Sequence, residues 1–335
     1  GNVAYPKADS LKEIRGRLRE QETLVFYTTC LGDAVALVVT RDGARIVRLG
    51  TVAAIEGVIK DMDALRRCVV EPLGLGGETR RVLISPAGAL CYVPFVLLFG
   101  DREVVYLPAG TAYGVLLDEA AKRGNGVLAL GDPDYAAKID QQALTLLRGG
   151  DSLVPLPGTR KEAKVIGDVV LLGSDVTEAG LASAVASRPR WRAVHFACHG
   201  LVDPERPLLS SLALSGGDFL TTLEVFRLKA PADLAVLSAC ETGKGKVYRT
   251  EGVVGFARAF MFAGSPRVIV SLWKVDDDAT QALMVKFYEL WNPKGGSKGL
   301  PCATALRKAQ EYVASQPKWK DPKYWAAWQL WGLPD

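Results

Sequence analysis

Two short apolar runs, each strand-like in composition, lead to side chains that can do chemistry. The first run, residues 191–200, ends at His199 and Gly200, and the second, residues 233–243, leads to Cys240. In a parallel sheet the carboxyl ends of neighbouring strands meet at one edge, which is where ligands bind. If the two runs pair, the imidazole and the thiol share that edge. These runs therefore favour a fold built around a parallel sheet.

The rest of the C-terminal half indicates the same fold class. Strand-like runs at residues 127–130 and 267–273 are separated by segments with helical spacing, which is the pattern of βαβ units. One helix is predicted over residues 159–170, with Thr159 as its N-cap and Glu162 completing a capping box. We therefore predict an α/β fold with a mostly parallel central sheet.

The N-terminal part adds further predicted elements. Apolar runs at residues 24–29, 34–40 and 44–49 predict strands, with a hairpin turn between the last two. Helical spacing predicts one helix over residues 53–70, and residues 81–85 predict a buried strand.

Composition narrows the classes of partner and the compartment. The chain has 335 residues, 49% of them hydrophobic, and a formal charge of +4 with Lys and Arg scattered among acids. Nucleic-acid binders instead concentrate basic residues, and a bilayer crossing needs roughly 20 apolar residues, so we expect neither partner. Six separated cysteines without a CxxC pair indicate reduced thiols and a cytoplasmic location. The polar start without Met indicates a domain of a longer protein and no secretory signal.

A thiol becomes a good nucleophile when a base lies next to it. Of the two histidines, His195 lies in mid-strand and is predicted to be buried and hydrogen-bonded. Alternation along the strand turns Cys198 away from His199, so we predict a dyad of His199 and Cys240. The backbone N–H groups of Cys240 and Gly200, the latter open to solvent, would form an oxyanion hole. The simpler alternative makes Cys240 a core thiol and His199 a turn residue.

Two other kinds of site are weaker matches. His195 and His199 have a ligand-like spacing, but four residues of a strand span about 13 Å, too far for one zinc ion. The residues after Cys240 superficially resemble a P-loop, yet the required first glycine is absent and neither Lys244 nor Lys246 precedes Ser or Thr. We therefore predict no metal and no nucleotide.

Three acids follow the predicted strand at residues 267–273. Asp276, Asp277 and Asp278 begin the next predicted helix, where an N-cap and the helix dipole favour acids. A second interpretation places one or more of them in an acidic pocket that binds a basic residue of a peptide. Trp273 is then either a wall of the peptide groove or part of the core.

Several motifs together resemble one known family. They lie at residues 81–95, 128–133, 195–200, 237–243, 251–260, 271–277 and 324–328. With these motifs the sequence is similar to the CHAT domain, a caspase-like and separase-like cysteine peptidase module.

The resemblance implies a caspase-like three-layer α/β/α fold, with a degenerate companion lobe over residues 1–125 and a catalytic lobe over residues 126–335. It implies a cysteine endopeptidase that uses His199 and Cys240, acts on a protein or peptide, and needs no cofactor. Family members usually carry TPR or other sensor domains, and several cleave a partner protein, such as a gasdermin-like pore former, in bacterial antiviral defence. The alternative is a catalytically silent CHAT scaffold that only binds its partners.

Overall fold

The helices and strands of the protein are known from a computed structural model. It describes residues 9–109, 112–120, 122–135, 153–201, 203, 206–238, 252–294 and 297–335. The α-helices are α1 (Leu11–Arg17), α2 (Val52–Gly57), α3 (Met62–Val69), α4 (Ala112–Ala120), α6 (Pro157–Ile166), α7 (Glu178–Ala186), α8 (Thr222–Arg227), α9 (Gly252–Phe262), α10 (Asp277–Trp291) and α11 (Cys302–Ser315). The strands are β1 (Glu22–Cys30), β2 (Asp33–Val39), β3 (Ala44–Thr51), β4 (Arg81–Ser85), β5 (Glu103–Tyr106), β6 (Asn125–Pro133), β7 (Val169–Gly173), β8 (Trp191–Ala197), β9 (Gly200–Leu201), β10 (Ser211–Ala213), β11 (Phe219–Thr221), β12 (Ala235–Leu237), β13 (Arg267–Ser271) and β14 (Trp328–Gly332).

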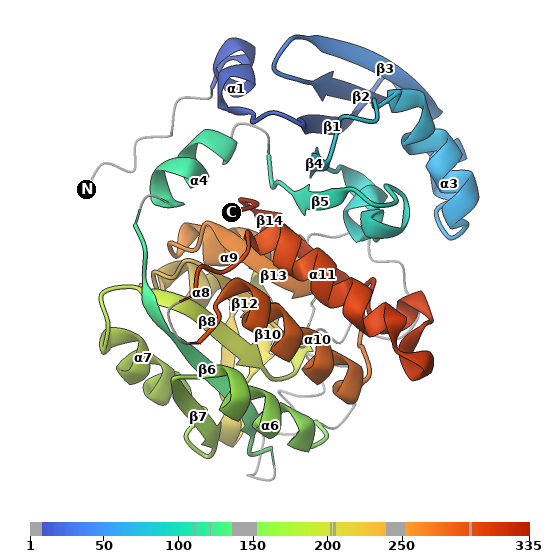
Figure 1. Ribbon diagram of the computed structural model, residues 1–335. Helices are drawn as coiled ribbons and strands as arrows, with labels where there is room; N and C mark the ends of the chain where they lie inside the picture. Colours follow the sequence, from blue (N-terminus) through green and yellow to red (C-terminus); the bar gives the residue numbers. More distant parts are fainter. Residues whose placement is uncertain are drawn as a thin grey trace.

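One large sheet runs through the molecule (Figure 1). Within the described residues it has eleven strands in the order β3-β2-β1-β4-β5-β14-β13-β12-β8-β6-β7. The pairs β1–β2, β2–β3 and β13–β14 are antiparallel, and the other neighbours are parallel. The predicted mostly parallel sheet is confirmed. A small second sheet has the order β11-β10-β9.

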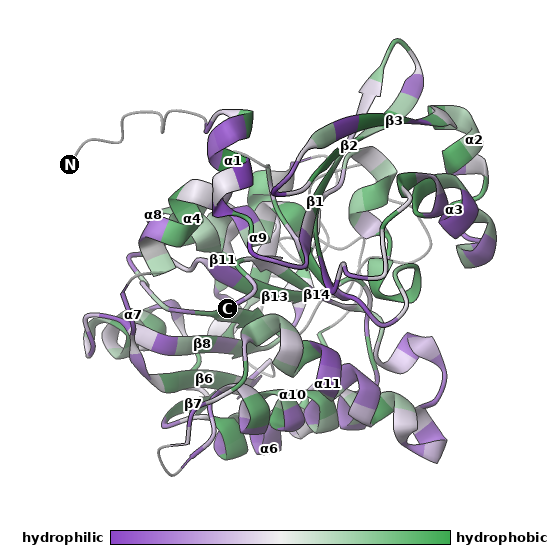
Figure 2. Cartoon of the chain, turned by 45° about the horizontal axis from the view of Figure 1, so that its top comes forward, coloured by the Kyte–Doolittle hydropathy of each residue, from purple (hydrophilic) through white to green (hydrophobic). Residues whose placement is uncertain are grey.

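Helices cover both faces of the large sheet and make three layers. Along β8, Ala193 joins the core beneath α1, α4, α6, α10 and α11, whereas Val194 and Phe196 join the core beneath α2, α3, α7, α8 and α9. This alternation is what a strand buried on both faces requires. Figure 2 shows the hydrophobic residues concentrated in strands such as β6 and β8, with hydrophilic residues along outer helices such as α3.

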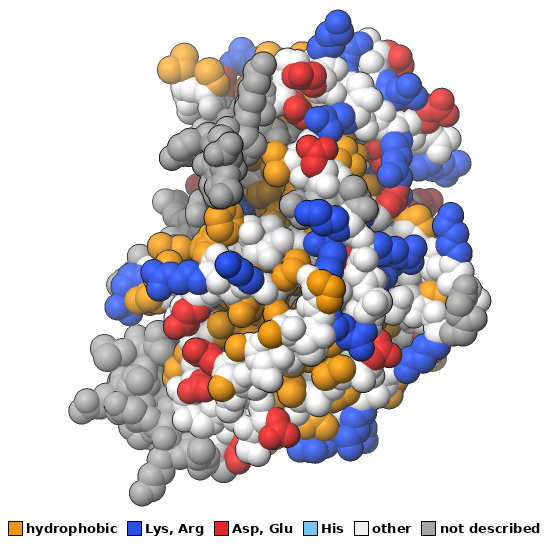
Figure 3. Space-filling view, turned by 90° about the vertical axis from the view of Figure 1, so that its left-hand side faces the viewer, with side chains coloured by type: hydrophobic (Ala, Val, Ile, Leu, Met, Phe, Trp, Pro, Cys, Tyr) orange, Lys and Arg blue, Asp and Glu red, His pale blue; other side chains and the backbone are white. Residues whose placement is uncertain are grey.

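Charged side chains of both signs share the surface, and the described helices are not of the kind that crosses a membrane. Figure 3 shows Lys and Arg side chains interspersed with Asp and Glu on one face. None of the helices in the described ranges combines the length and the apolar character that a membrane crossing demands.

The prediction of a single helix over residues 53–70 is wrong, because the segment contains the two helices α2 and α3. The side chain of Asp61 accepts a hydrogen bond from the N–H of Ala64 at 2.9 Å and so caps the start of α3. The apolar spacing continues across the break, which is why the pattern predicted one helix.

Helix α6 packs unusually closely against β6. A Cβ atom added to Gly131 in β6 would lie 2.5 Å from the carbonyl oxygen of Thr159 in α6. The next residue, Asp132, has a φ of 48° and its N–H donates to the Thr159 hydroxyl at 2.7 Å. Glycine at position 131 therefore sets the distance between α6 and the sheet.

We predict that Gly131→Ala lowers the free energy of unfolding by about 1–3 kcal/mol, because the added methyl group forces β6 and α6 apart. The matched control is Gly255→Ala in α9, where an added Cβ meets no atom within 4 Å. That change should stabilise the protein by about 0.5–1 kcal/mol. Urea unfolding measures both, and equal stability of the two variants would contradict the packing argument.

Candidate active site

The two predicted strands are neighbours and end at the same edge of the sheet. β8 and β12 pair in parallel, with Phe196 opposite Leu237. The N–H of Ser238 continues the ladder by donating to the carbonyl of Phe196 at 2.8 Å. His199 lies two residues after the last residue of β8, Ala197. Cys240 lies outside the described residues, two positions after Ser238, so the dyad remains a prediction.

The imidazole of His199 is buried and held by a backbone carbonyl. Its Nε2 lies 2.7 Å from the carbonyl oxygen of Val154. A carbonyl oxygen can only accept a hydrogen bond, so Nε2 carries the proton. In the neutral ring Nδ1 is then the basic nitrogen, which suits a general base.

Tyr135 fixes the backbone around His199, and the sequence analysis missed it. The N–H of His199 donates to the Tyr135 hydroxyl at 3.2 Å, and that hydroxyl donates to the carbonyl of Ala213 at 3.1 Å. The two rings also pack, with centroids 5.2 Å apart. The only signal in the sequence was the position of Tyr135 just after the turn that ends β6.

Gly200 begins β9 and faces Leu212 of β10. The carbonyl of the preceding residue, His199, accepts from the N–H of Ala213 at 2.8 Å, so ladder bonds flank Gly200 and its own N–H points away from β10. Gly200 is buried, which corrects the expectation that its N–H is open to solvent.

The buried carboxylate of Glu162, in α6, is hydrogen-bonded to a residue of β8 and to the residue that follows β12. Oε1 of Glu162 accepts from Nε2 of His195 at 2.7 Å and from the hydroxyl of Ser238 at 2.8 Å. The predicted burial and hydrogen bonding of His195 are thereby confirmed.

The predicted capping box is wrong. α6 begins at Pro157, with Leu156 as an N-cap that makes no side-chain bond. The Thr159 hydroxyl instead donates to the carbonyl of Leu156 at 2.7 Å. Glu162, which would have closed the box, turns into the protein interior.

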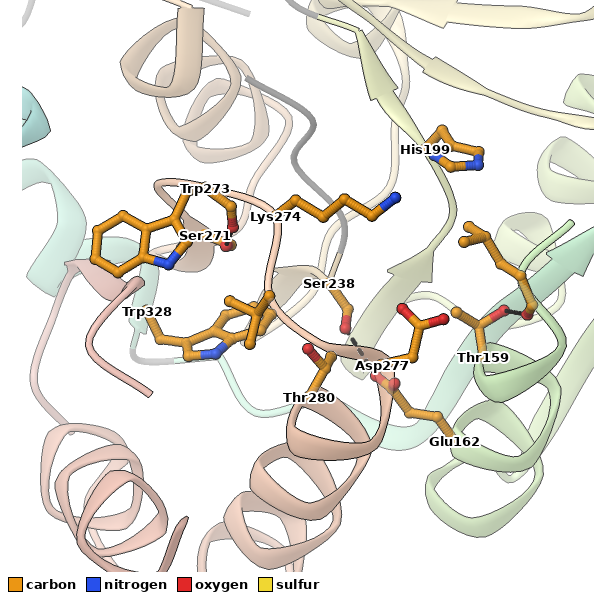
Figure 4. Close-up of a pocket in the computed structure, with 12 residues that line it drawn as sticks. Thr159, Glu162, His199, Ser238, Ser271, Trp273, Lys274, Asp277, Thr280 and Trp328 are labelled. Carbon is orange, nitrogen blue, oxygen red and sulfur yellow. Dashed lines mark hydrogen bonds between the residues drawn. The ribbon is translucent and has the colours of Figure 1, made fainter. Parts of the chain in front are cut away.

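A hollow opens between these groups and the segment after β13 (Figure 4). Its volume is about 40 Å³. The lining residues are Leu156, Thr159, Glu162, His199, Ser238, Ser271, Trp273, Lys274, Val275, Asp277, Thr280 and Trp328. The predicted Trp273 and Asp277 thus lie in the same hollow as His199.

The three acids have different environments. Asp276 is the N-cap of α10, and its side chain accepts from the N–H of Ala279 at 3.0 Å. Asp277 and Asp278 lie in the first turn, and only Asp277 lines the hollow. Asp277 is exposed at the rim, yet loss of surrounding water raises the pKa of its carboxyl, with Lys274 opposing the shift and Asp276 and Glu162 adding to it.

The histidines have separate partners. Nε2 of His195 contacts Glu162, whereas Nε2 of His199 contacts Val154. Within the part of the chain that the structure describes, no group of three or more His, Cys, Asp or Glu side chains is arranged to hold a metal ion.

Comparisons with known proteins place this geometry in context. The family model of the CHAT domain matches residues 60–333. Tetratricopeptide repeat protein 28 of Homo sapiens is 26% identical over an alignment of 307 residues, and the match covers 76% of this chain and 12% of that protein. The chain therefore spans about an eighth of the length of this curated relative.

Two solved structures resemble the fold. The Arg specific cysteine proteinase gingipain R has a TM-score of 0.50 and 14% identity, covering 85% of this chain and 68% of that chain. Separase of Saccharomyces cerevisiae, in its complex with securin, has a TM-score of 0.47 and 13% identity, covering 82% of this chain and 17% of that chain. The likeness to gingipain R confirms the predicted fold class.

We predict that Asp276→Ala destabilises the protein by about 1 kcal/mol, since it removes the cap of α10. The matched control is Asp278→Ala, which removes an acid from the first turn of α10 and with it a favourable interaction with the helix dipole, which salt screens. Urea unfolding at low salt and in 1 M NaCl separates the two: the Asp276 effect should persist, and the Asp278 effect should fade. If salt abolished both, the capping role of Asp276 would be wrong.

Proposed function

Since the chain belongs to the CHAT domain family, we propose that it is a cysteine endopeptidase with a dyad of His199 and Cys240. The observation that carries the proposal is the buried His199, oriented by Val154, at the edge where β12 also ends. Such a base, placed beside the segment that leads to a thiol, is what nucleophilic catalysis needs.

In this mechanism Nδ1 of His199 accepts the thiol proton, and the sulfur of Cys240 attacks the carbonyl carbon of the peptide bond. The N–H groups of Gly200 and Cys240 stabilise the negative oxygen that forms. His199 then gives its proton to the leaving amine, and an acyl-enzyme remains. His199 takes a proton from water, the resulting hydroxide attacks the thioester, and the thiol is restored.

The substrate-binding part of the proposal centres on Asp277 and Trp273, which line the hollow next to His199. We propose that the hollow binds a basic side chain before the cut bond. Gingipain R, with its similar fold, is named as Arg specific. The capping role of Asp276 leaves that acid less suited to bind a substrate.

The setting of the reaction is inferred from the family. We propose a cytoplasmic enzyme that cleaves a specific partner protein, such as a gasdermin-like substrate in bacterial defence, under the control of TPR or other sensor domains. The curated relative is itself named for tetratricopeptide repeats.

We expect iodoacetamide to label Cys240 selectively at pH 7. An ordinary thiol is only a few per cent thiolate at pH 7, so full conversion to thiolate raises the labelling rate up to about 30-fold. His199→Ala should remove that increase. Exposed Cys30 is the reference within the same molecule, and buried Cys302 should stay unlabelled because burial raises its pKa to about 12.

Mass spectrometry of the labelled peptides measures the rates, and a peptide library treated with the wild type and with Cys240→Ala tests cleavage. Cleavage should be lost in Cys240→Ala. Equal labelling of Cys240 and Cys30, with no cleavage of any peptide, would contradict the peptidase proposal and favour the catalytically silent scaffold.

We also expect KM for a peptide with Arg before the cut to rise as the pH falls. Protonation removes the charge of Asp277, and because its pKa is raised, the rise should begin at a higher pH than for an ordinary aspartate. Asp277→Asn should flatten this acid limb and lower kcat/KM about 10- to 100-fold. An unchanged limb would assign the pH dependence to another group.

A further inference from the structure

The proposed mechanism leaves one buried ionisable group unused. Glu162 reaches from α6 to the sheet, and its side chain is 2% exposed. A carboxylate is removed from water at a large cost unless hydrogen bonds compensate it. The hydrogen bonds from His195 and Ser238 both go to Oε1 of Glu162, so neither of these two bonds uses Oε2.

The partners of Glu162 use one of its two carboxylate oxygens. The hydroxyl of Ser238 and Nε2 of His195 both lie on Oε1, and Nδ1 of His195 lies 3.4 Å from the hydroxyl of Tyr288. A carboxylate has two oxygens that accept hydrogen bonds, so these two bonds leave capacity for a cationic ligand.

The location of Glu162 is suited to a substrate side chain. It lines the same hollow as Asp277 and His199, next to Ser238, which lies two residues before the proposed nucleophile. A volume of about 40 Å³ holds roughly three water-sized groups, close to the four heavy atoms of a guanidinium.

Two acids and one Lys set the charge of the hollow. The two acids are Glu162 in α6 and Asp277 in α10, and the positive charge comes from Lys274. Figure 4 shows the amino group of Lys274 extending toward His199, with Asp277 and Glu162 near each other below it, beside Thr159. The part of the hollow between α6 and α10 is therefore acidic.

We propose that Glu162 is a specificity-determining residue: its carboxylate forms the floor of the hollow and, together with Asp277 at the rim, binds the guanidinium or ammonium group of the residue before the cut bond. The inference rests on the proposed peptidase activity and deepens it. A purely structural role, in which Glu162 only holds Ser238 in place, is the competing explanation.

The test compares two peptides that differ only in Arg or citrulline before the cut, since citrulline has nearly the shape of Arg without its charge. Glu162→Gln keeps an oxygen that accepts from His195 and Ser238 but removes the negative charge. We expect kcat/KM for the Arg peptide to fall about 10- to 100-fold, mainly through KM, and the citrulline peptide to change less than about threefold. Equal losses for both peptides would establish the structural role and overturn the proposal.

A charge-retaining variant covers the case in which Glu162→Gln does not fold. Glu162→Asp keeps the charge, so the preference for Arg over citrulline should stay within about tenfold of the wild type. Loss of that preference in a folded Glu162→Asp protein would contradict the proposal. Ser238→Ala is the matched control, because it removes one donor to Glu162 and should leave the preference for Arg.

Labelling of Cys240 by iodoacetamide, which is small and uncharged, separates this inference from the activity itself. If wild-type Cys240 is not selectively labelled and no peptide is cut, the proposed function fails. If Cys240 is labelled and peptides are cut without a preference for Arg, only the role of Glu162 fails.

Discussion

The parallel pairing of β8 with β12 is the contact on which the candidate site depends. Because the two strands run in the same direction, His199 and the segment after Ser238 leave the sheet at one edge. The pairing also fixes which face each side chain occupies. A shift of one residue would turn Ser238 to the opposite face and break its bond to Glu162. The register of two strands thus determines both the placement of the base and the lining of the hollow.

The buried carboxylate shows how this register is held from outside the sheet. Gly131 lets α6 approach β6 so closely that Glu162 reaches both strands. Each bond satisfies a donor that would otherwise be buried without a partner, so the three side chains are stable only together. The result is a site supported by a helix and two strands, which restricts movement more than a loop would.

The sequence predicted the parts of the site that follow from strand periodicity. The position of His195 in the middle of a strand predicted its burial, and the end of the apolar run predicted that His199 lies at the sheet edge. Glu162 was assigned to a capping box because a Thr three residues before a Glu matches that pattern; the helix in fact begins earlier, at Pro157. The role of Tyr135 depends on contacts with β10, which no local pattern contains.

The strand β14 went unpredicted for the same reason, although it completes the hollow. It lies between β5 and β13, so the predicted regions 1–125 and 126–335 contribute to one sheet, while their division into two lobes stays a prediction. The side chain of Gln329 donates to the carbonyl of Val93 at 3.2 Å and accepts from Trp331, which ties β14 to a segment far away in sequence. Trp328, at the start of the same strand, lines the hollow.

Because β13 is paired on both sides, by β12 and β14, the segment that carries Asp277 starts from a strand with little freedom to move. A rigid support of this kind favours selectivity for a cationic side chain of the substrate. If the acidic hollow could widen, it would also accept a neutral side chain, with water filling the space of the cationic group.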